Sequence, residues 1–278
     1  MPAGLLSIGD YSLSVDAITD GREGAAVVFV AGTGGDSADS FAAVTALLDD
    51  LPLVCYARPG LGRSEPAPVT TPRGVRAAAQ ELHALLRAAK IPAPWVLVGH
   101  SYGALICEVF AAEWPEDAAG LVLVDGSDAQ LNIDLGRPLV DDGDEPGTIP
   151  FDSVVVAADM FRARRAATTR PVAVVASRPG RWLDVAPADD WHPLTLAEMD
   201  DRWQAHQAAS AHRLGGDLFT AEVGGHHVQR DAPELVAKAI RRVYDRLGAT
   251  GRQGDLVGAS PTCGSGLLTV VERCDPLG

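Results

Sequence analysis

Cysteine is scarce in this chain, which has four cysteines among 278 residues, at positions 55, 107, 263 and 274. No two of them stand in the C-x-x-C spacing that structural metal sites use, so we expect no bound metal. Cys55 and Cys107 lie inside apolar runs, where free buried thiols are common. A bridge between Cys263 and Cys274 stays an open alternative.

Long apolar runs are also absent. No segment reaches the roughly 18 consecutive apolar residues that a membrane-spanning helix needs. The start of the chain, Met1–Val15, lacks the cationic region and continuous apolar stretch of a secretion signal. We therefore expect a cytoplasmic protein with no membrane partner.

Basic residues are outnumbered, since Lys and Arg total 23 against 37 Asp and Glu, which gives a formal net charge of -14. The field of such a chain repels polyanions before contact, which argues against nucleic acid and anionic membrane surfaces as partners. A small neutral substrate molecule fits this balance better. With 47% hydrophobic residues, the chain can bury one full core. The composition does not indicate an oligomeric state.

Short apolar runs without polar alternation predict parallel strands that are covered on both faces. They occupy residues 25–31, 53–56, 95–98, 121–124 and 172–176. Apolar residues at helical spacing lie between them, most clearly in 72–90 behind Thr71 and Pro72. Strands that alternate with helices indicate an open, doubly wound α/β sheet. Ahead of them, the alternation of polar and apolar residues through 5–18 predicts an antiparallel hairpin.

The domain boundaries follow from the places where this rhythm lapses. Residues 126–170 begin with a stretch dense in Asp, Gly and Pro and contain one helical pattern, 151–166. We therefore expect a small cap inserted into a single domain that spans 1–248. The tail, 249–278, is rich in Gly, Ser, Thr and Pro but contains the apolar stretch 266–271, so disorder and an added terminal element both stay open.

The segment Gly99-His100-Ser101-Tyr102-Gly103 joins a predicted strand to a helical run of small residues. A serine at such a turn is held with its hydroxyl exposed above the sheet, and the flanking glycines let strand and helix approach closely. This is the pattern of a nucleophile elbow. Because G-x-S-x-G also arises by chance, the interpretation needs a base and an acid elsewhere in the chain.

The candidate base lies in Gly224-Gly225-His226-His227, which follows a predicted strand, 218–223, and precedes a helix. Asp231-Ala232-Pro233-Glu234 reads as a capping box that starts this last helix. We predict that His226, directly after the glycine pair, is the catalytic base, since it stands at the sheet end that carries Ser101. His227 is the neighbouring alternative.

Donors for an oxyanion are expected from two backbone N–H groups. One is that of Tyr102, after the nucleophile, and the other is that of Thr33 in the loop Gly32-Thr33-Gly34-Gly35, which follows a strand. The rival interpretation of this loop is a dinucleotide fingerprint, but the third glycine of that pattern would fall at Ser37. The loop therefore favours oxyanion binding.

With these motifs, the chain resembles the α/β-hydrolase fold family from about residue 25 to 247. The resemblance rests on the glycine loop, the elbow, the segment Tyr56-Ala57-Arg58-Pro59-Gly60-Leu61-Gly62-Arg63-Ser64, the strand 120–125 and the final Gly-His loop. Many relatives carry aspartate where this chain has Ala57. The motifs are specific for the fold and much less so for the substrate, since esterases, lactonases, thioesterases and peptidases look similar.

Two aspartates compete for the role of the acid that orients the histidine. In many family members the acid follows the strand after the cap, where the first carboxylate here is Asp184, eight residues beyond the end of that strand at residue 176. Asp125 stands directly at the end of the strand 121–124, and some members place the acid there. We predict Asp125, because a strand-end carboxylate is held rigidly.

The resemblance and the residues together predict a cofactor-free serine hydrolase of a small ester, lactone or thioester. Ser101 is the nucleophile, His226 the base and Asp125 its partner, with Thr33 and Tyr102 as oxyanion donors. A serine at the elbow argues against dehalogenase or epoxide hydrolase chemistry. A cyclase or lyase, or a ligand receptor that keeps the pocket for binding, stays as the alternative. In the cap, Val154–Val156, Met160 and Phe161 are candidates for an apolar pocket lining or for ordinary packing.

Overall fold

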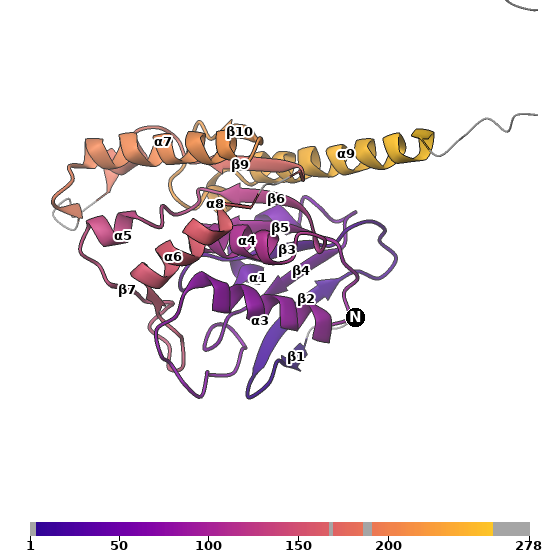
Figure 1. Ribbon diagram of the computed structural model, residues 1–278, viewed down its shortest axis with the longest axis horizontal. Helices are drawn as coiled ribbons and strands as arrows, with labels where there is room; N and C mark the ends of the chain where they lie inside the picture. The colour runs from indigo at the N-terminus through magenta and orange to yellow at the C-terminus, as the bar shows by residue number, and fades with distance from the viewer. Residues whose placement is uncertain (1–3, 167–168, 186–190, 258–278) are drawn as a thin grey trace, which may run out of the picture.

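The computed structural model describes residues 4–166, 169–185 and 191–257, and an eight-stranded sheet runs through its centre (Figure 1). The strand order is β1-β2-β4-β3-β5-β6-β9-β10. The pairs β1/β2 and β2/β4 are antiparallel and the others are parallel. This confirms the doubly wound sheet and the hairpin that the sequence predicts. The strands are β1 Gly4–Ser7, β2 Ser12–Ile18, β3 Val27–Val30, β4 Leu53–Tyr56, β5 Trp95–His100, β6 Ala118–Val124, β9 Val172–Ala176 and β10 Asp217–Thr220.

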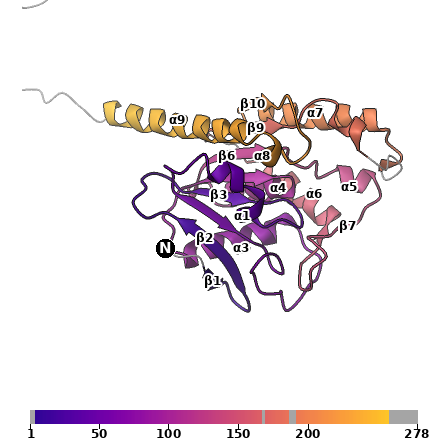
Figure 2. The ribbon, with the colours of Figure 1, turned by 180° about the vertical axis from the view of Figure 1, so that it is seen from behind.

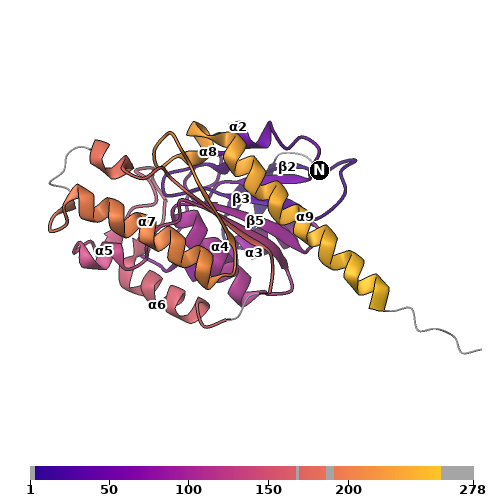
Figure 3. The same cartoon turned by 90° about the horizontal axis from the view of Figure 1, so that it is seen from above.

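Apolar side chains on both faces of the central strands form two cores. Val28, Val30 and Leu97 pack on the face that α3 and α4 cover, whereas Phe29 and Val98 pack on the other face, beneath α2 and α9. Figure 3 shows α2 and α8 on one side of the sheet and α3, α4 and α6 on the other. The central strands therefore lack polar alternation because neither of their faces meets water.

The helices that the sequence predicts are present as α3, α4, α6 and α9. The view from behind in Figure 2 shows α9 running along the sheet beside β9. The bounds of the helices, with those of the minor elements, are α1 Ser37–Ser40, α2 Ala42–Thr45, α3 Val75–Ala88, α4 Tyr102–Glu113, α5 Leu131–Asp134, β7 Leu139–Val140, β8 Phe151–Asp152, α6 Ser153–Ala163, the 3-10 helix η1 Arg181–Asp184, α7 Leu196–Arg213, α8 Val228–Asp231 and α9 Pro233–Val257.

The segment between β6 and β9 carries α5, the short β7/β8 pair and α6. Val156 and Met160 of α6 are buried in the core, whereas Phe161 is 68% exposed. Of the two uses that the sequence leaves open for these residues, ordinary packing is therefore the one that the structure gives Val156 and Met160, whereas Phe161 faces solvent. Ser153 begins the helix because the Asp152 carboxylate accepts from the next backbone N–H groups.

A second covering element, α7, lies between β9 and β10, where the sequence analysis identified no helix. Its apolar spacing is weak, but Thr195 and Glu198 form a capping box at its start. Buried Met199 and Trp203 bind it to the 3-10 helix η1 below. The covering of the sheet end is therefore made by two segments rather than by 126–170 alone.

The last part of the chain differs from the prediction in one contact. The Asp231 carboxylate does not cap the final helix; its Oδ2 accepts a hydrogen bond from Gly225 N at 2.7 Å, and α9 begins at Pro233. The reason is that α8 ends at Asp231 and turns this side chain toward the glycine loop. Helix α9 continues past Leu247 to Val257, and the apolar stretch 266–271 lies outside the described residues. Within the described ranges, none of the helices combines the length and apolar character needed to cross a membrane.

Candidate active site

Ser101 stands in the sharp turn between β5 and α4 with φ 53° and ψ -120°, a conformation that non-glycine residues rarely adopt. The glycines around it are required by close contacts. A Cβ atom on Gly99 would lie 2.4 Å from the Gly103 carbonyl oxygen, and one on Gly103 would lie 2.1 Å from that of Val30. The elbow geometry is therefore built from backbone contacts that only glycine allows.

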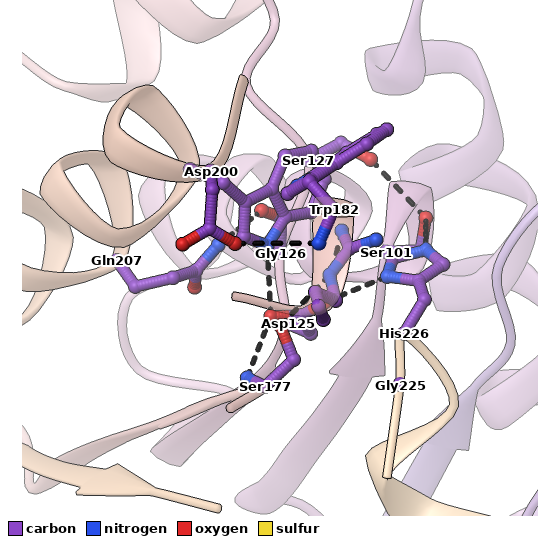
Figure 4. A network of polar contacts seen from close by, with 12 residues as sticks. Ser101, Asp125, Gly126, Ser127, Ser177, Trp182, Asp200, Gln207, Gly225 and His226 are labelled. Atoms are coloured by element: carbon purple, nitrogen blue, oxygen red, sulfur yellow. Dashed lines mark hydrogen bonds and ion pairs between the residues drawn. The ribbon is translucent and has the colours of Figure 1, made fainter. Parts of the chain in front are cut away.

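A chain of hydrogen bonds links three of the predicted site residues (Figure 4). His226 Nε2 lies 2.9 Å from Ser101 Oγ, and His226 Nδ1 lies 2.7 Å from Asp125 Oδ2. The residues come from three sequence regions: Ser101 follows β5, Asp125 follows β6 and His226 follows β10. All three strands end on the same edge of the sheet, which places their loops together.

Asp125 is fully buried, and both oxygens of its carboxylate have polar partners. Ser177 N and Trp203 Nε1 each donate to Oδ1 at 2.8 Å, and the Arg181 guanidinium lies 3.4 Å from Oδ2. Burial alone would raise the pKa of Asp125, but the hydrogen bond and charge of His226, aided by Arg181, outweigh it and lower the pKa. Asp125 is therefore a carboxylate whose charged form the site favours.

Asp184, the alternative candidate for the acid, does not contact His226. Asp184 ends the 3-10 helix η1 with its side chain 68% exposed, and it pairs with Arg178. The structure brings Asp125, and not Asp184, to His226 Nδ1.

Two contacts hold the backbone of His226. The neighbouring Gly225 N–H donates to Asp231, as described above, and the His226 carbonyl accepts from His100 Nε2 at 2.9 Å. A carbonyl can only accept, so His100 carries its proton on Nε2. Burial, together with the adjacent His226, holds the pKa of His100 well below its usual range. His100 is therefore a neutral, structural histidine, and His227 lies outside the chain that joins Ser101 to Asp125.

The glycine loop Gly32–Gly35 runs directly against the elbow. A Cβ atom on Gly32 would lie 3.0 Å from Ser101 Cβ, a tight contact that the absence of a side chain avoids. Thr33 and Tyr102 both line the cavity beside Ser101. Ser37, where a dinucleotide fingerprint would need glycine, is the first residue of α1 and donates its hydroxyl to the Phe29 carbonyl.

A cavity of about 340 Å³ opens beside Ser101 and His226. Three of the five tryptophans in the chain line it. Their rings pack edge to face, and the ring centroid of Trp182 lies 4.5 Å from that of Trp191 and 5.4 Å from that of Trp203. The guanidinium carbon of Arg181 lies over the rings of Trp182 and Trp203, 4.1 and 4.6 Å from their centroids. The other lining residues are Thr33, Tyr102, Ser127, Asp128, Leu131, Asn132, Arg137, Val140 and Val185.

Sequence reasoning missed this tryptophan cluster. The signal was its density, since all three rings fall between residues 182 and 203, in a stretch without strand pattern. Among the described residues, no group of three or more His, Cys, Asp or Glu side chains is placed to hold a metal ion.

The fold and this site define a class of protein, the α/β hydrolases. A model of the alpha/beta hydrolase family matches residues 27–239, and the chain belongs to that family. It is 37% identical over 109 residues to the uncharacterized protein YqjL of Bacillus subtilis (strain 168), a match that covers 38% of this chain and 41% of YqjL. It is 34% identical over 92 residues to an AB hydrolase superfamily protein of Gibberella zeae, covering 32% of this chain and 28% of that protein. The chain thus spans less than half the length of both relatives.

The fold is also similar to solved structures. Est1E from Butyrivibrio proteoclasticus, determined with bound ferulic acid, superposes with a TM-score of 0.63 at 16% identity. The superposition covers 89% of this chain and 100% of Est1E. At this identity the likeness shows the fold alone.

Proposed function

We propose that this protein is a serine hydrolase that cleaves a small carboxylic ester, lactone or thioester. Ser101 Oγ attacks the carbonyl carbon while His226 Nε2 takes the hydroxyl proton. The N–H groups of Thr33 and Tyr102 hold the resulting oxyanion. The intermediate collapses as His226 returns the proton to the leaving alcohol or thiol. Water, deprotonated by His226, then releases the acid from Ser101.

The observation that carries this proposal is the chain of hydrogen bonds from Ser101 through His226 to Asp125. Serine is a weak nucleophile at neutral pH and needs a base within hydrogen-bond reach. Asp125, held ionised, favours the tautomer with a proton on Nδ1, which leaves Nε2 free to accept from Ser101. Membership of the alpha/beta hydrolase family supports the same reading.

The cavity supports an apolar acyl or leaving group of modest size. Its volume of about 340 Å³ is near the lower end of ligand pockets, and indole rings make much of its wall. Est1E, which has a similar fold, was solved with ferulic acid, an aromatic acid. We propose that the tryptophan-lined cavity binds an aromatic or short branched apolar group.

Labelling and product analysis test the proposal together. A fluorophosphonate should add one phosphonyl group to Ser101, detected by intact mass and peptide mapping, and a panel of p-nitrophenyl esters should release acid and p-nitrophenol. A receptor without esterase chemistry would neither label nor turn over. A cyclase or lyase that uses the same residues would label but release no acid, and that result would replace hydrolysis as the function.

The choice of acid is tested by a pair of substitutions. We expect Asp125→Asn to lower kcat by about 10⁴-fold, because the amide favours the wrong histidine tautomer. Asp184→Asn should stay within about threefold of wild type, since exposed side chains away from a site usually contribute little. Steady-state kinetics of both variants on one ester gives the comparison. Equal losses in the two variants would contradict the assignment.

Trp203 and Trp182 provide a second matched pair. Trp203→Phe removes a donor to buried Asp125, and hydrogen bonds to charged groups contribute about 1.5–3 kcal/mol, so we expect kcat to fall by about 10- to 100-fold. Trp182→Phe removes a similar ring, but its indole N–H has no hydrogen-bond partner within the described residues. Its kcat should change much less than that of Trp203→Phe, as measured in the same assay. Similar losses would show that the rings act only through cavity shape.

A further inference from the structure

Arg58 belongs to the sequence segment 56–64 that resembles the family, yet the proposed chemistry gives it no role. It is 2% exposed and follows β4, beneath the glycine loop. Its guanidinium donates to the Ala31 carbonyl from Nη1 at 2.8 Å and to the Gly32 carbonyl from Nη2 at 2.6 Å. A buried cation is therefore bonded to the backbone just before Thr33.

The partner of this cation comes from the inserted segment. Asp142, between β7 and β8, accepts from Arg58 Nε and Nη2 at 2.6 Å each, and it is 1% exposed. Its Oδ1 also accepts from Gly34 N at 3.4 Å. Burial opposes the charged form of Arg58, but the attraction of Asp142 outweighs it and raises the arginine pKa. The pair bonds the loop on both sides of Thr33.

The geometry of the peptide group links the contacts at the Gly32 carbonyl to the direction of the Thr33 N–H. The Gly32 carbonyl and the Thr33 N–H belong to one planar trans peptide, in which the two groups point in opposite directions. The bond from Arg58 to the carbonyl, together with a longer one of 3.2 Å from Gly35 N, therefore fixes where the N–H points. A charged donor on the carbonyl also polarises the peptide and strengthens the N–H as a donor.

We propose that the buried Arg58–Asp142 pair positions and polarises the Gly32–Thr33 peptide as an oxyanion donor, so that the inserted segment takes part in assembling the oxyanion site. This inference rests on the proposed function, because it assigns the Thr33 N–H to an oxyanion. Arg58 and Asp142 are positioning residues, since neither lines the cavity beside Ser101. Their effect falls on the transition state, where the negative charge develops.

Removal of the whole pair is the main test. The double variant Arg58→Met/Asp142→Leu leaves no uncompensated buried charge, and such apolar replacements often keep a protein folded. We expect kcat on p-nitrophenyl acetate to fall by about 10²-fold, as for loss of one oxyanion donor. KM should stay within about threefold, because ground-state binding is not altered. Phenylboronic acid forms a tetrahedral anionic adduct with a catalytic serine, and its inhibition constant should rise by a similar factor to the loss in kcat.

A control pair separates this role from structural support. Glu108 and Arg213 form another ion pair with a buried member, at 2.7 Å, and neither lines the cavity beside Ser101. Glu108→Leu/Arg213→Met should keep kcat and the boronate inhibition constant of wild type. Asp142→Asn, which keeps the side-chain volume but removes the charge, should show the same kcat loss in weaker form, at about tenfold. Circular dichroism establishes that each variant is folded.

The outcomes distinguish the two proposals. Wild-type kcat and boronate affinity in a folded Arg58→Met/Asp142→Leu or Asp142→Asn variant overturn the positioning role alone. A rise in KM with unchanged kcat also overturns it, because that pattern indicates a role in substrate binding. If the wild-type protein neither labels with fluorophosphonate nor releases acid from esters, the proposed function itself fails.

Discussion

Substitution of Ser101 by alanine is expected to lower kcat by about 10⁴- to 10⁶-fold, the range found when a serine nucleophile is removed. The hydroxyl makes hydrogen bonds to His226 at 2.9 Å and Ser127 at 3.2 Å and has no other role in the core. Thermal unfolding should therefore shift by only a few degrees, since a small loss of about 1 kcal/mol moves Tm by roughly 2–4 °C in a domain of this size. Ester hydrolysis and circular dichroism measure the two effects.

Ser127→Ala is the matched control for this variant. It removes a hydroxyl from the same cavity wall and the same hydrogen bond to Ser101, but not the nucleophile. We expect its kcat to stay within about tenfold of wild type, since one neutral hydrogen bond contributes about 1 kcal/mol. Wild-type turnover in purified Ser101→Ala would contradict the serine mechanism.

The second large effect is expected from His226. His226→Ala removes the group that takes and returns the proton, so kcat should fall by about 10⁶-fold, as when the base of a serine triad is removed. His227→Ala should retain most of its activity, because the ring of His227 stands outside the Ser101–His226–Asp125 chain. Both imidazoles are packed near His100, at 4.6 and 5.2 Å between ring centroids, so the pair is matched in surroundings.

The rate of covalent labelling is a second readout for the same two variants. Fluorophosphonate labelling should slow by orders of magnitude in His226→Ala and proceed at nearly the wild-type rate in His227→Ala. Low activity in His227→Ala, with turnover retained in His226→Ala, would assign the base to the other histidine.

Local sequence patterns were sufficient for most of the fold. Unalternating apolar runs predicted β3, β4, β5, β6 and β9, because parallel strands buried on both faces select apolar residues at every position. The elbow was equally local, since Gly99 and Gly103 are required by backbone contacts within a few residues of Ser101 or with the adjacent strand. The predicted capping role of Asp231 was wrong, since its carboxylate accepts from Gly225 N instead.

Other features depended on segments that are distant in the sequence. The sequence favoured Asp125, at a strand end, over Asp184, but the contact itself depends on the packing of the sheet edge, which brings Asp125 to His226 across 101 residues. The tryptophan-lined cavity needed α7 to fold over that edge, and the amphipathic pattern of α7 is weak because it covers a site rather than a continuous core.

The sequence by itself determined the alternation of strands and helices, the strained serine turn and the glycine loop, since each follows from the chemistry of neighbouring residues. Only the tertiary structure decided which carboxylate meets the histidine, which rings line the cavity and that Asp142 pairs with Arg58 across 84 residues. The physical reason is that a hydrogen bond or a buried ion pair needs its atoms within about 3 Å, and that distance is set by how whole elements pack.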